Sequence, residues 1–509
     1  MVAGASRSVP LLVLATAALA GCSENTSSQL LVPASIHITS ARLIDDTIDA
    51  AVGPMLVEVR DDHGHLVPGG VISISASDEL LGTPVFWGSD PDMLPGGRPD
   101  TIRTHADGIA RVYLRFNARI GNFFVYAAAG QSRDSIAVTI RPGKPFSFDL
   151  SPRDTAVYPG AAYPVAWRVY DRAHHATPYA VTLTTRRPEI ASLDPNDSVH
   201  ALATGRVYIV ASAESARDSV ALSVVPHGRI LAFTRRYGSG DIAKFVMFEL
   251  DGSQYRTLDT TSFAYNNRAQ YFLPNGQKVV YHDVARDLLH RLWTMDTLGT
   301  VDTLFRPTGT IAGAAMPQPS RDGAWVYFSA SMGYEKAEVW RITSDGQTPT
   351  RIGPVSTQGD IYGAASPSPD GSSLAVIVDR LALLQGVHLG VISVATGQFQ
   401  LIAPAAPAPT LPRWSPVGDE IAYFGDKGLS VVRSDGQLLF GPVATPAGAG
   451  WDTADGQLDW SGDGKWLIAC MTGASAGDRH IVVIDRATGE VLPIAFTARE
   501  RLCGATWHP

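Results

Sequence analysis

A cysteine near the start of the chain carries the most specific chemistry in the sequence. Arg7 precedes an apolar run, Val9 to Ala20, which has the length of an export signal and is too short to cross a bilayer as a helix. The run ends in small residues directly before Cys22. Cleavage at that point would make Cys22 the first mature residue and leave its thiol free to be alkylated by a diacylglycerol group.

The segment Leu19-Ala20-Gly21-Cys22 resembles the lipobox of bacterial lipoproteins. The resemblance implies a signal peptide over residues 1–21, a lipidated Cys22, and a polar tether over residues 22–33. A diacylglyceryl group together with an N-acyl chain anchors a protein firmly. In a Gram-negative host, Ser23 after Cys22 implies the outer membrane, on its periplasmic or surface face. The alternative is an ordinary secretory signal in which the cysteine is incidental.

A second group of candidate residues is set by a glycine that recurs every 46 to 48 residues in the second half of the chain. Five residues before each of the last five glycines, and at the matching position of the final strand, the side chain carries a polar group, and we place these positions on inner strands around a common axis. A polar ring at a concave channel mouth could bind a small ligand or a peptide. A water-filled channel lined for solubility is the alternative. Arg413 and Asp459 fall on neighbouring repeats and could pair; the full set is Tyr271, Gln318, Ser366, Arg413, Asp459 and Thr506.

Other motifs give weaker signals. Residues 473–477 spell the Gly-x-Ser-x-Gly nucleophile elbow, but the motif leads into another strand and not into a helix, and His480 follows too closely to be a triad partner, so a hairpin loop is the better interpretation. His63 with His65, and His174 with His175, lie in turn-like segments that lack converging metal donors. Residues 452–456 lack the acidic spacing of a calcium loop. We therefore expect no catalytic residue, no metal site and no cofactor.

Two cysteines remain after Cys22. Cys470 ends an apolar strand and Cys503 lies in the last strand of the chain. In an oxidising envelope the two could form a disulfide that pins the C-terminus. Two buried thiols are the alternative.

Composition excludes one class of partner. The net charge is -8, and no basic cluster is present, which argues against nucleic acid. The hydrophobic content of 45% and the charged content of 18% are those of a globular protein. No later apolar run has transmembrane length.

The first half of the mature chain predicts two β-sandwiches built from short alternating strands. Residues 34–142 resemble the invasin-type bacterial Ig-like domain, in an alternating strand that runs into Asp61, a Pro68-Gly69 turn, and Asp107-Gly108-x-Ala110. Residues 145–226 resemble the second bacterial Ig-like type, through Pro188-Glu189-Ile190-Ala191-Ser192-Leu193-Asp194 and Val199-His200-Ala201-Leu202.

The second half predicts a cyclic array. We interpret the recurrent glycines as turn glycines, each followed by an apolar strand; they are Gly228, Gly276, Gly323, Gly371, Gly418 and Gly464. A period near 45 residues with short strands is typical of a β-propeller. Residues 228–509 resemble the TolB-type and WD-like propeller, most closely at Trp414-Ser415-Pro416-x-Gly418 with Ile421-Ala422-Tyr423. The array starts without an opening strand and the chain ends in one, so we predict six blades closed by the C-terminal strand.

These features predict an all-β protein: two Ig-like sandwiches followed by a six-bladed propeller. The function that fits best is a non-enzymatic, membrane-anchored envelope lipoprotein for binding or scaffolding, whose propeller presents a protein-, peptide- or glycan-binding face. By resemblance, TolB-type propellers serve in envelope assemblies and bacterial Ig-like domains occur in adhesins. The alternatives are a surface adhesin and a propeller enzyme, a glycan hydrolase or lyase. We expect a monomer, anchored to the membrane and without a nucleic-acid partner.

Overall fold

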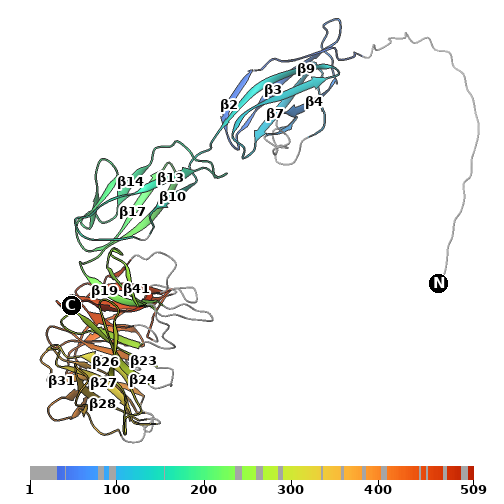
Figure 1. Ribbon diagram of the computed structural model, residues 1–509. Coiled ribbons are helices and arrows are strands. Elements are labelled where there is room, and N and C mark those ends of the chain that lie inside the picture. The colour runs from blue at the N-terminus through green and yellow to red at the C-terminus, as the bar shows by residue number, and fades with distance from the viewer. Residues whose placement is uncertain are drawn as a thin grey trace, which may run out of the picture. The chain divides into compact units, whose positions relative to one another are not determined.

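The computed structural model describes residues 31–509, except 41, 78–84, 91–98, 154, 235–243, 260–267, 285–289, 334–335, 357–359, 381–385, 403–409, 446–448, 454–456, 474–478 and 495–501. Within these ranges the regular elements are all β-strands (Figure 1). None of the described residues belongs to a helix long and apolar enough to cross a membrane. The described residues form two compact units, one of residues up to Lys144 with Asp171–Thr177, and one of Pro145–Tyr170 with residues from Pro178 onward.

The first unit contains two sheets that share one core. One sheet has the order β1 (Ser35–Ile38), β3 (Ala51–Arg60), β7 (Ile109–Phe116) and β5 (Val85–Gly88). The other has the order β2 (Leu43–Thr47), β9 (Ser132–Arg141), β8 (Gly121–Ala129), β4 (Val71–Ala76) and β6 (Ile102–Arg103). Alternate residues of β7 are buried, as the two-residue period of a strand requires. Their side chains pack with Val125 and Val138 from the facing sheet, which makes this unit a β-sandwich.

Residues 145–226, apart from the Asp171–Thr177 segment, form three smaller sheets around a second core. The largest has the order β11 (Thr155–Val157), β18 (Ala216–Val224), β17 (Gly205–Ala213) and β14 (Thr182–Thr185). The second has the order β12 (Ala162–Pro164), β16 (Ser198–Ala201) and β15 (Ala191–Leu193), and β10 (Ser147–Ser151) pairs with β13 (Ala166–Tyr170).

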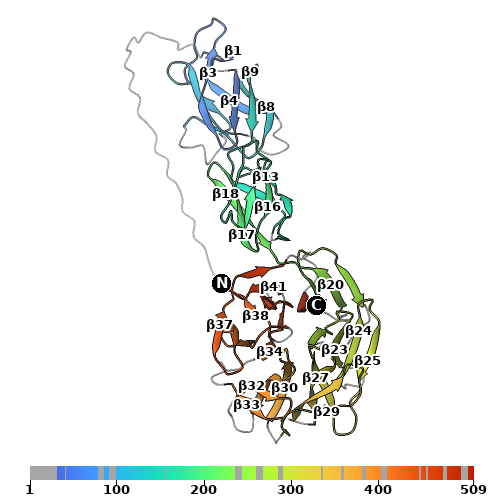
Figure 2. The ribbon, with the colours of Figure 1, turned by 90° about the vertical axis from the view of Figure 1, so that its left-hand side faces the viewer.

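The remaining sheets stand around a common axis as the blades of a β-propeller (Figure 2). The first of these sheets contains β22 (Arg268–Phe272), β23 (Lys278–Val284), β24 (His290–Asp296) and β25 (Val301–Phe305). The next is an eight-stranded sheet of two four-stranded groups, joined where β28 pairs with β30 at Ala337 and Ile361: β26 (Gly313–Pro319), β27 (Trp325–Ser331), β28 (Ala337–Thr343) and β29 (Thr350–Arg351), then β30 (Asp360–Pro367), β31 (Ser373–Arg380), β32 (Val387–Ser393) and β33 (Phe399–Leu401). The last two contain β34 (Thr410–Trp414), β35 (Ile421–Gly425), β36 (Gly428–Val432) and β37 (Leu438–Val443), and β38 (Gly450–Trp451), β39 (Asp459–Trp460), β40 (Trp466–Thr472), β41 (Arg479–Asp485) and β42 (Val491–Pro493).

One further sheet joins the two ends of this region. It has the order β21 (Arg256–Asp259), β20 (Lys244–Glu249), β19 (Arg229–Thr234) and β43 (Leu502–Trp507). The last strand runs antiparallel to β19, with Ile230 opposite Trp507 and Leu231 opposite Thr506. The pairing predicted for the C-terminal strand is therefore present, and it removes a free strand edge.

The recurrent glycines do not all have the same role. Gly276, Gly323, Gly371, Gly418 and Gly464 adopt φ values between 67° and 75°, the left-handed conformation that suits glycine in a tight turn. Gly228 is different. A Cβ atom on it would lie 2.3 Å from Cζ3 of Trp507, so this position admits the close approach of the closing strand. Its interpretation as a turn glycine equivalent to the other five is wrong.

Candidate binding pocket

Bulges in the inner strands aim polar side chains toward the axis. In β26 the register shifts between Ala315 and Gln318, and in β30 it shifts between Gly363 and Ser366. A β-bulge inserts an extra residue and re-aims the side chains that follow it. The bulges contain residues in the left-handed region at equivalent positions, namely Met316 (φ 53°), Ala364 (φ 48°) and Gly504 (φ 60°).

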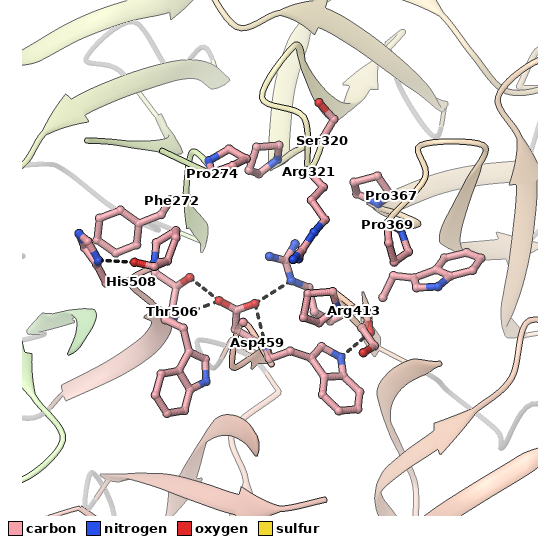
Figure 3. Close-up of a pocket in the computed structure, with 18 residues that line it drawn as sticks. Phe272, Pro274, Ser320, Arg321, Pro367, Pro369, Arg413, Asp459, Thr506 and His508 are labelled. Carbon is pink, nitrogen blue, oxygen red and sulfur yellow. Dashed lines mark hydrogen bonds and ion pairs between the residues drawn. The ribbon is translucent and has the colours of Figure 1, made fainter. Parts of the chain in front are cut away.

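Arg413 connects the polar positions that the sequence places on different blades (Figure 3). Its Nε atom donates to Asp459 Oδ1 at 2.8 Å, and its Nη1 atom donates to Gln318 Oε1 at 2.8 Å. The guanidinium carbon lies 4.0 Å from the centroid of the Tyr271 ring. An ion pair, a neutral hydrogen bond and a cation–π contact therefore meet at one side chain.

Asp459 is saturated with hydrogen-bond donors. Besides Arg413, its Oδ1 atom accepts from the backbone N–H of Trp460 at 2.9 Å. Its Oδ2 atom accepts from Thr506 Oγ1 at 2.6 Å and from the backbone N–H of Trp507 at 3.1 Å. The Asp459 side chain is 6% exposed, and an ionised carboxylate has about four acceptor positions. All of them are occupied, so this buried charge is fully compensated.

Tyr271 and Ser366 complete the set. The Tyr271 hydroxyl donates to the carbonyl oxygen of Leu458 at 3.3 Å, and burial raises the pKa of the phenol above its ordinary value. The phenol is therefore neutral at physiological pH. Ser366 Oγ accepts from the backbone N–H of Trp414 at 2.8 Å, which links two neighbouring inner strands without reaching Arg413. The structure thus brings five of the predicted residues into one network and places Ser366 beside it.

A cavity of about 430 Å³ lies at this end of the inner strands, with Arg413, Asp459 and Thr506 in its lining. Sequence reasoning missed the other lining residues, which follow the polar positions by one to three residues. The residue after each polar position is aromatic or proline: Phe272, Pro319, Pro367, Trp414, Trp460 and Trp507. The residues three positions after a polar position include Pro274, Arg321, Pro369, Pro416 and Pro509. Counting forward from the polar positions in the same repeat would have found them.

The turns at the rim of the cavity are held by a repeated hydrogen-bond unit. Ser320 Oγ donates to Asp322 at 2.5 Å and accepts from the N–H of Trp325 at 2.9 Å. Ser368 makes the same pair of bonds, to Asp370 at 2.6 Å and from Ser373 at 3.0 Å. The serine hydrogen bond lowers the pKa of the carboxyl groups of Asp322 and Asp370. The rim is therefore a set of rigid turns.

The other sequence candidates lie elsewhere. Asp61, Asp62 and His63 place potential ligand atoms within 4.8 Å of one another, but Asp62 and His63 are exposed. Asp61 Oδ1 accepts from the backbone N–H groups of His63 and His65, at 2.9 and 2.8 Å, as in a turn. His174 adopts a left-handed conformation, and the neighbouring His175 contacts Asp171 at 3.2 Å.

Several candidates fall outside the described residues. They are Cys22, residues 474–477 of the elbow-like motif, and residues 454–456 of the acidic loop. Cys470 is buried in β40, and the side chain of Cys503 is outside the described part of the chain. The disulfide between them therefore stays a prediction. Mass analysis of the unreduced protein after alkylation would test it, because two modified thiols would exclude the bond.

Comparison with known proteins gives no family assignment. No family model matches the chain. An uncharacterized protein of Agrobacterium fabrum, Atu1656, is 27% identical over 209 residues, which cover 39% of this chain and 67% of that protein.

Solved structures similar to this chain include TolB proteins. TolB from Acinetobacter baumannii is 14% identical with a TM-score of 0.45, over 65% of this chain and 83% of that one. A putative TolB from Agrobacterium tumefaciens is 16% identical with a TM-score of 0.40, over 56% of this chain and 99% of that one. An oligogalacturonate lyase in complex with manganese is 16% identical with a TM-score of 0.35, over 52% and 73% of the two chains. The solved structures similar to this chain thus include both TolB proteins and a lyase.

Proposed function

We propose that this chain is a non-enzymatic binding or scaffolding protein of the bacterial cell envelope, anchored to the membrane through an acylated Cys22. In this proposal residues 34–142 and 145–226 are Ig-like domains that act as spacers. Residues 228–509 are a six-bladed propeller whose pocket at the end of the inner strands receives a protein, peptide or glycan partner. The anchor would lie on the outer membrane.

The hydrogen bonds that the Asp459 carboxylate already accepts support a binding role over a catalytic one. It is the only carboxylate side chain among the residues that line the pocket. General acid–base chemistry at a glycosidic bond needs a pair of carboxyl groups, and metal-assisted chemistry needs free donor atoms. Both oxygens of Asp459 already accept two hydrogen bonds each. The Arg413–Asp459 pair thus forms part of the binding surface at the floor of the pocket.

The binding role is tested with a double variant, Arg413→Ala with Asp459→Ala, in the full-length anchored protein. Removing both charges together avoids leaving either one buried alone, which would cost stability. Partners crosslinked in cells are purified with the protein and quantified by mass spectrometry. We expect the yield of specific partners to fall at least about tenfold, a loss of about 1.4 kcal/mol of binding free energy.

A matched control keeps this result interpretable. Arg153 and Asp218 form an exposed ion pair at 2.9 Å on the domain that precedes the propeller. The Arg153→Ala, Asp218→Ala variant removes the same two charges away from the pocket and should leave the partner yield unchanged. An unchanged yield in the pocket variant, with its thermal stability retained, would contradict the proposed site.

A further inference from the structure

One rim turn of the pocket carries a cation at a position where most of the others carry proline and one carries Gly462. Arg321 lies between β26 and β27, at the position taken by Pro274, Pro369 and Pro416 in other blades. The residue is exposed, and within the described part of the chain it has no ion-pair partner. Its side chain extends from the rim toward the centre of the pocket, where the Arg413 guanidinium also lies (Figure 3).

Arg413 retains hydrogen-bonding capacity toward the same cavity. Its Nε and Nη1 atoms are committed to Asp459 and Gln318. A guanidinium carries five N–H donors, and the two on Nη2 have no acceptor among the described residues. Two cationic side chains therefore line the cavity, and the acceptor positions of Asp459, the one carboxylate side chain in its lining, are all occupied. The unoccupied guanidinium donors of Arg321 and Arg413 favour an anionic ligand.

The hydroxyl groups of the lining are already committed. Ser320 Oγ is bonded to Asp322 and Trp325, and Thr506 Oγ1 donates to Asp459. Ser415 Oγ donates to the carbonyl oxygen of Val417 at 2.7 Å. A sugar would bring several hydroxyl oxygens to the pocket, and the protons of these three side-chain hydroxyl groups are already donated elsewhere.

The aromatic side chains also disfavour a sugar. Trp414 and Trp507 are each 7% exposed and Trp460 is 3% exposed, so none offers a free ring face for stacking. The accessible walls are mainly proline rings. This surface suits an apolar group, while the two guanidinium groups suit a planar, bidentate acceptor such as a carboxylate.

We propose that the pocket binds a carboxylate group between Arg321 and Arg413, carried by an apolar body that packs against the proline-rich wall. The carboxylate comes from the free C-terminus of a peptide or from a small organic acid. This inference rests on the proposed binding function and adds to it the chemical class of the ligand. The cavity of about 430 Å³ is within the usual range of small-ligand sites, about 300–1,000 Å³.

The test compares acids with their uncharged amides on the detergent-solubilised full chain. The probes are acetyl-Ala-Pro-Phe with a free carboxylate and its carboxamide, hexanoate and hexanamide, and lactose as a neutral disaccharide. Binding is measured by calorimetry at low and high salt. We expect each acid to bind at least about tenfold more tightly than its amide, and to weaken with added salt because screening reduces charge attraction. Tighter binding of the peptide assigns the carboxylate to a peptide terminus, and equal binding of hexanoate assigns it to small acids.

Substitution of Arg321 is the second part of the test. Arg321→Gln should weaken binding of the acids about tenfold, because it removes one charge-assisted hydrogen bond, and should leave binding of the amides unchanged. Arg321→Lys should restore part of the lost affinity for the acids. The control is Arg351→Gln, at an exposed arginine in β29. Three results would overturn the inference: equal affinity for an acid and its amide, binding of lactose with an affinity that Arg321→Gln does not change, or no binding of any probe. The crosslinking experiment on Arg413 and Asp459 remains a separate measure of the binding function itself.

Discussion

The closing strand contains a glycine whose replacement tests how the propeller is sealed. Gly504 lies in the bulge where β43 pairs with β19, and its φ is 60°. A Cβ atom at this position would lie 2.1 Å from Cε1 of Phe233, whose side chain is buried. The substitution Gly504→Ala therefore meets two penalties, one in the backbone and one in packing.

The expected magnitude follows from these two penalties. A left-handed conformation costs a residue with a Cβ atom roughly 1–2 kcal/mol. Forcing a methyl group into a packed core costs about 1–3 kcal/mol more, because Phe233 must move. Together these destabilise the propeller by about 2–5 kcal/mol. Gly371 provides a matched control: its φ is 71° and a Cβ atom there meets nothing within 4 Å. Gly371→Ala should cost only the backbone part, about 1–2 kcal/mol.

Urea unfolding followed by tryptophan fluorescence is the assay, because eight of the ten tryptophans lie in residues 228–509. The midpoint should fall further for Gly504→Ala than for Gly371→Ala at an unchanged slope. Adding Phe233→Leu to Gly504→Ala should recover part of the loss, since neighbouring substitutions are not additive. Equal midpoints for the two glycine variants, or no recovery with Phe233→Leu, would refute the argument that Gly504 packs against Phe233 in a closed ring.

Three further predictions concern the pocket floor, the rim turns and the anchor. Asp459→Asn should destabilise the propeller by about 2–4 kcal/mol in the same unfolding assay, since Arg413 loses its counter-charge and a donor is left without an acceptor; a change below about 1 kcal/mol would contradict the network. Ser368→Ala should reduce stability at pH 7 and less so at pH 3. The depressed pKa of Asp370 contributes stability above about pH 4, and this contribution is lost as the pH falls through the folded-state pKa, so an equal deficit at both pH values would be evidence against it. Cys22→Ser should abolish incorporation of labelled fatty acid and move the protein from the detergent phase to the aqueous phase, and retained labelling would exclude Cys22 as the anchor.

Much of the fold could be predicted because it is a repeated local pattern. An apolar strand after a tight turn recurs with little change in spacing, and the partial unit at each end predicted the pairing of β43 with β19. The boundary glycine was misjudged for a physical reason. Gly228 matches the spacing of the turn glycines, but the requirement there is room for Trp507, which only the packed structure reveals.

The site could be predicted in part for the same reason. Position within the repeat placed the polar side chains on inner strands, and opposite charges on neighbouring blades predicted the Arg413–Asp459 pair, which the structure contains. The hydrogen bond between Arg413 and Gln318 could not be predicted in this way. Gln318 lies two repeats before Arg413, and it reaches the guanidinium only because the ring brings the inner strands of all blades to one axis.

The last residue of the sequence, Pro509, borders the same cavity as Arg413. Any polypeptide appended after it would therefore emerge at the mouth of the pocket, where a flexible tail can compete with a ligand for space. An affinity tag for purification or for binding measurements is better inserted in an exposed turn of the domains before the propeller. Loss of ligand binding in a C-terminally tagged protein would otherwise be mistaken for absence of function.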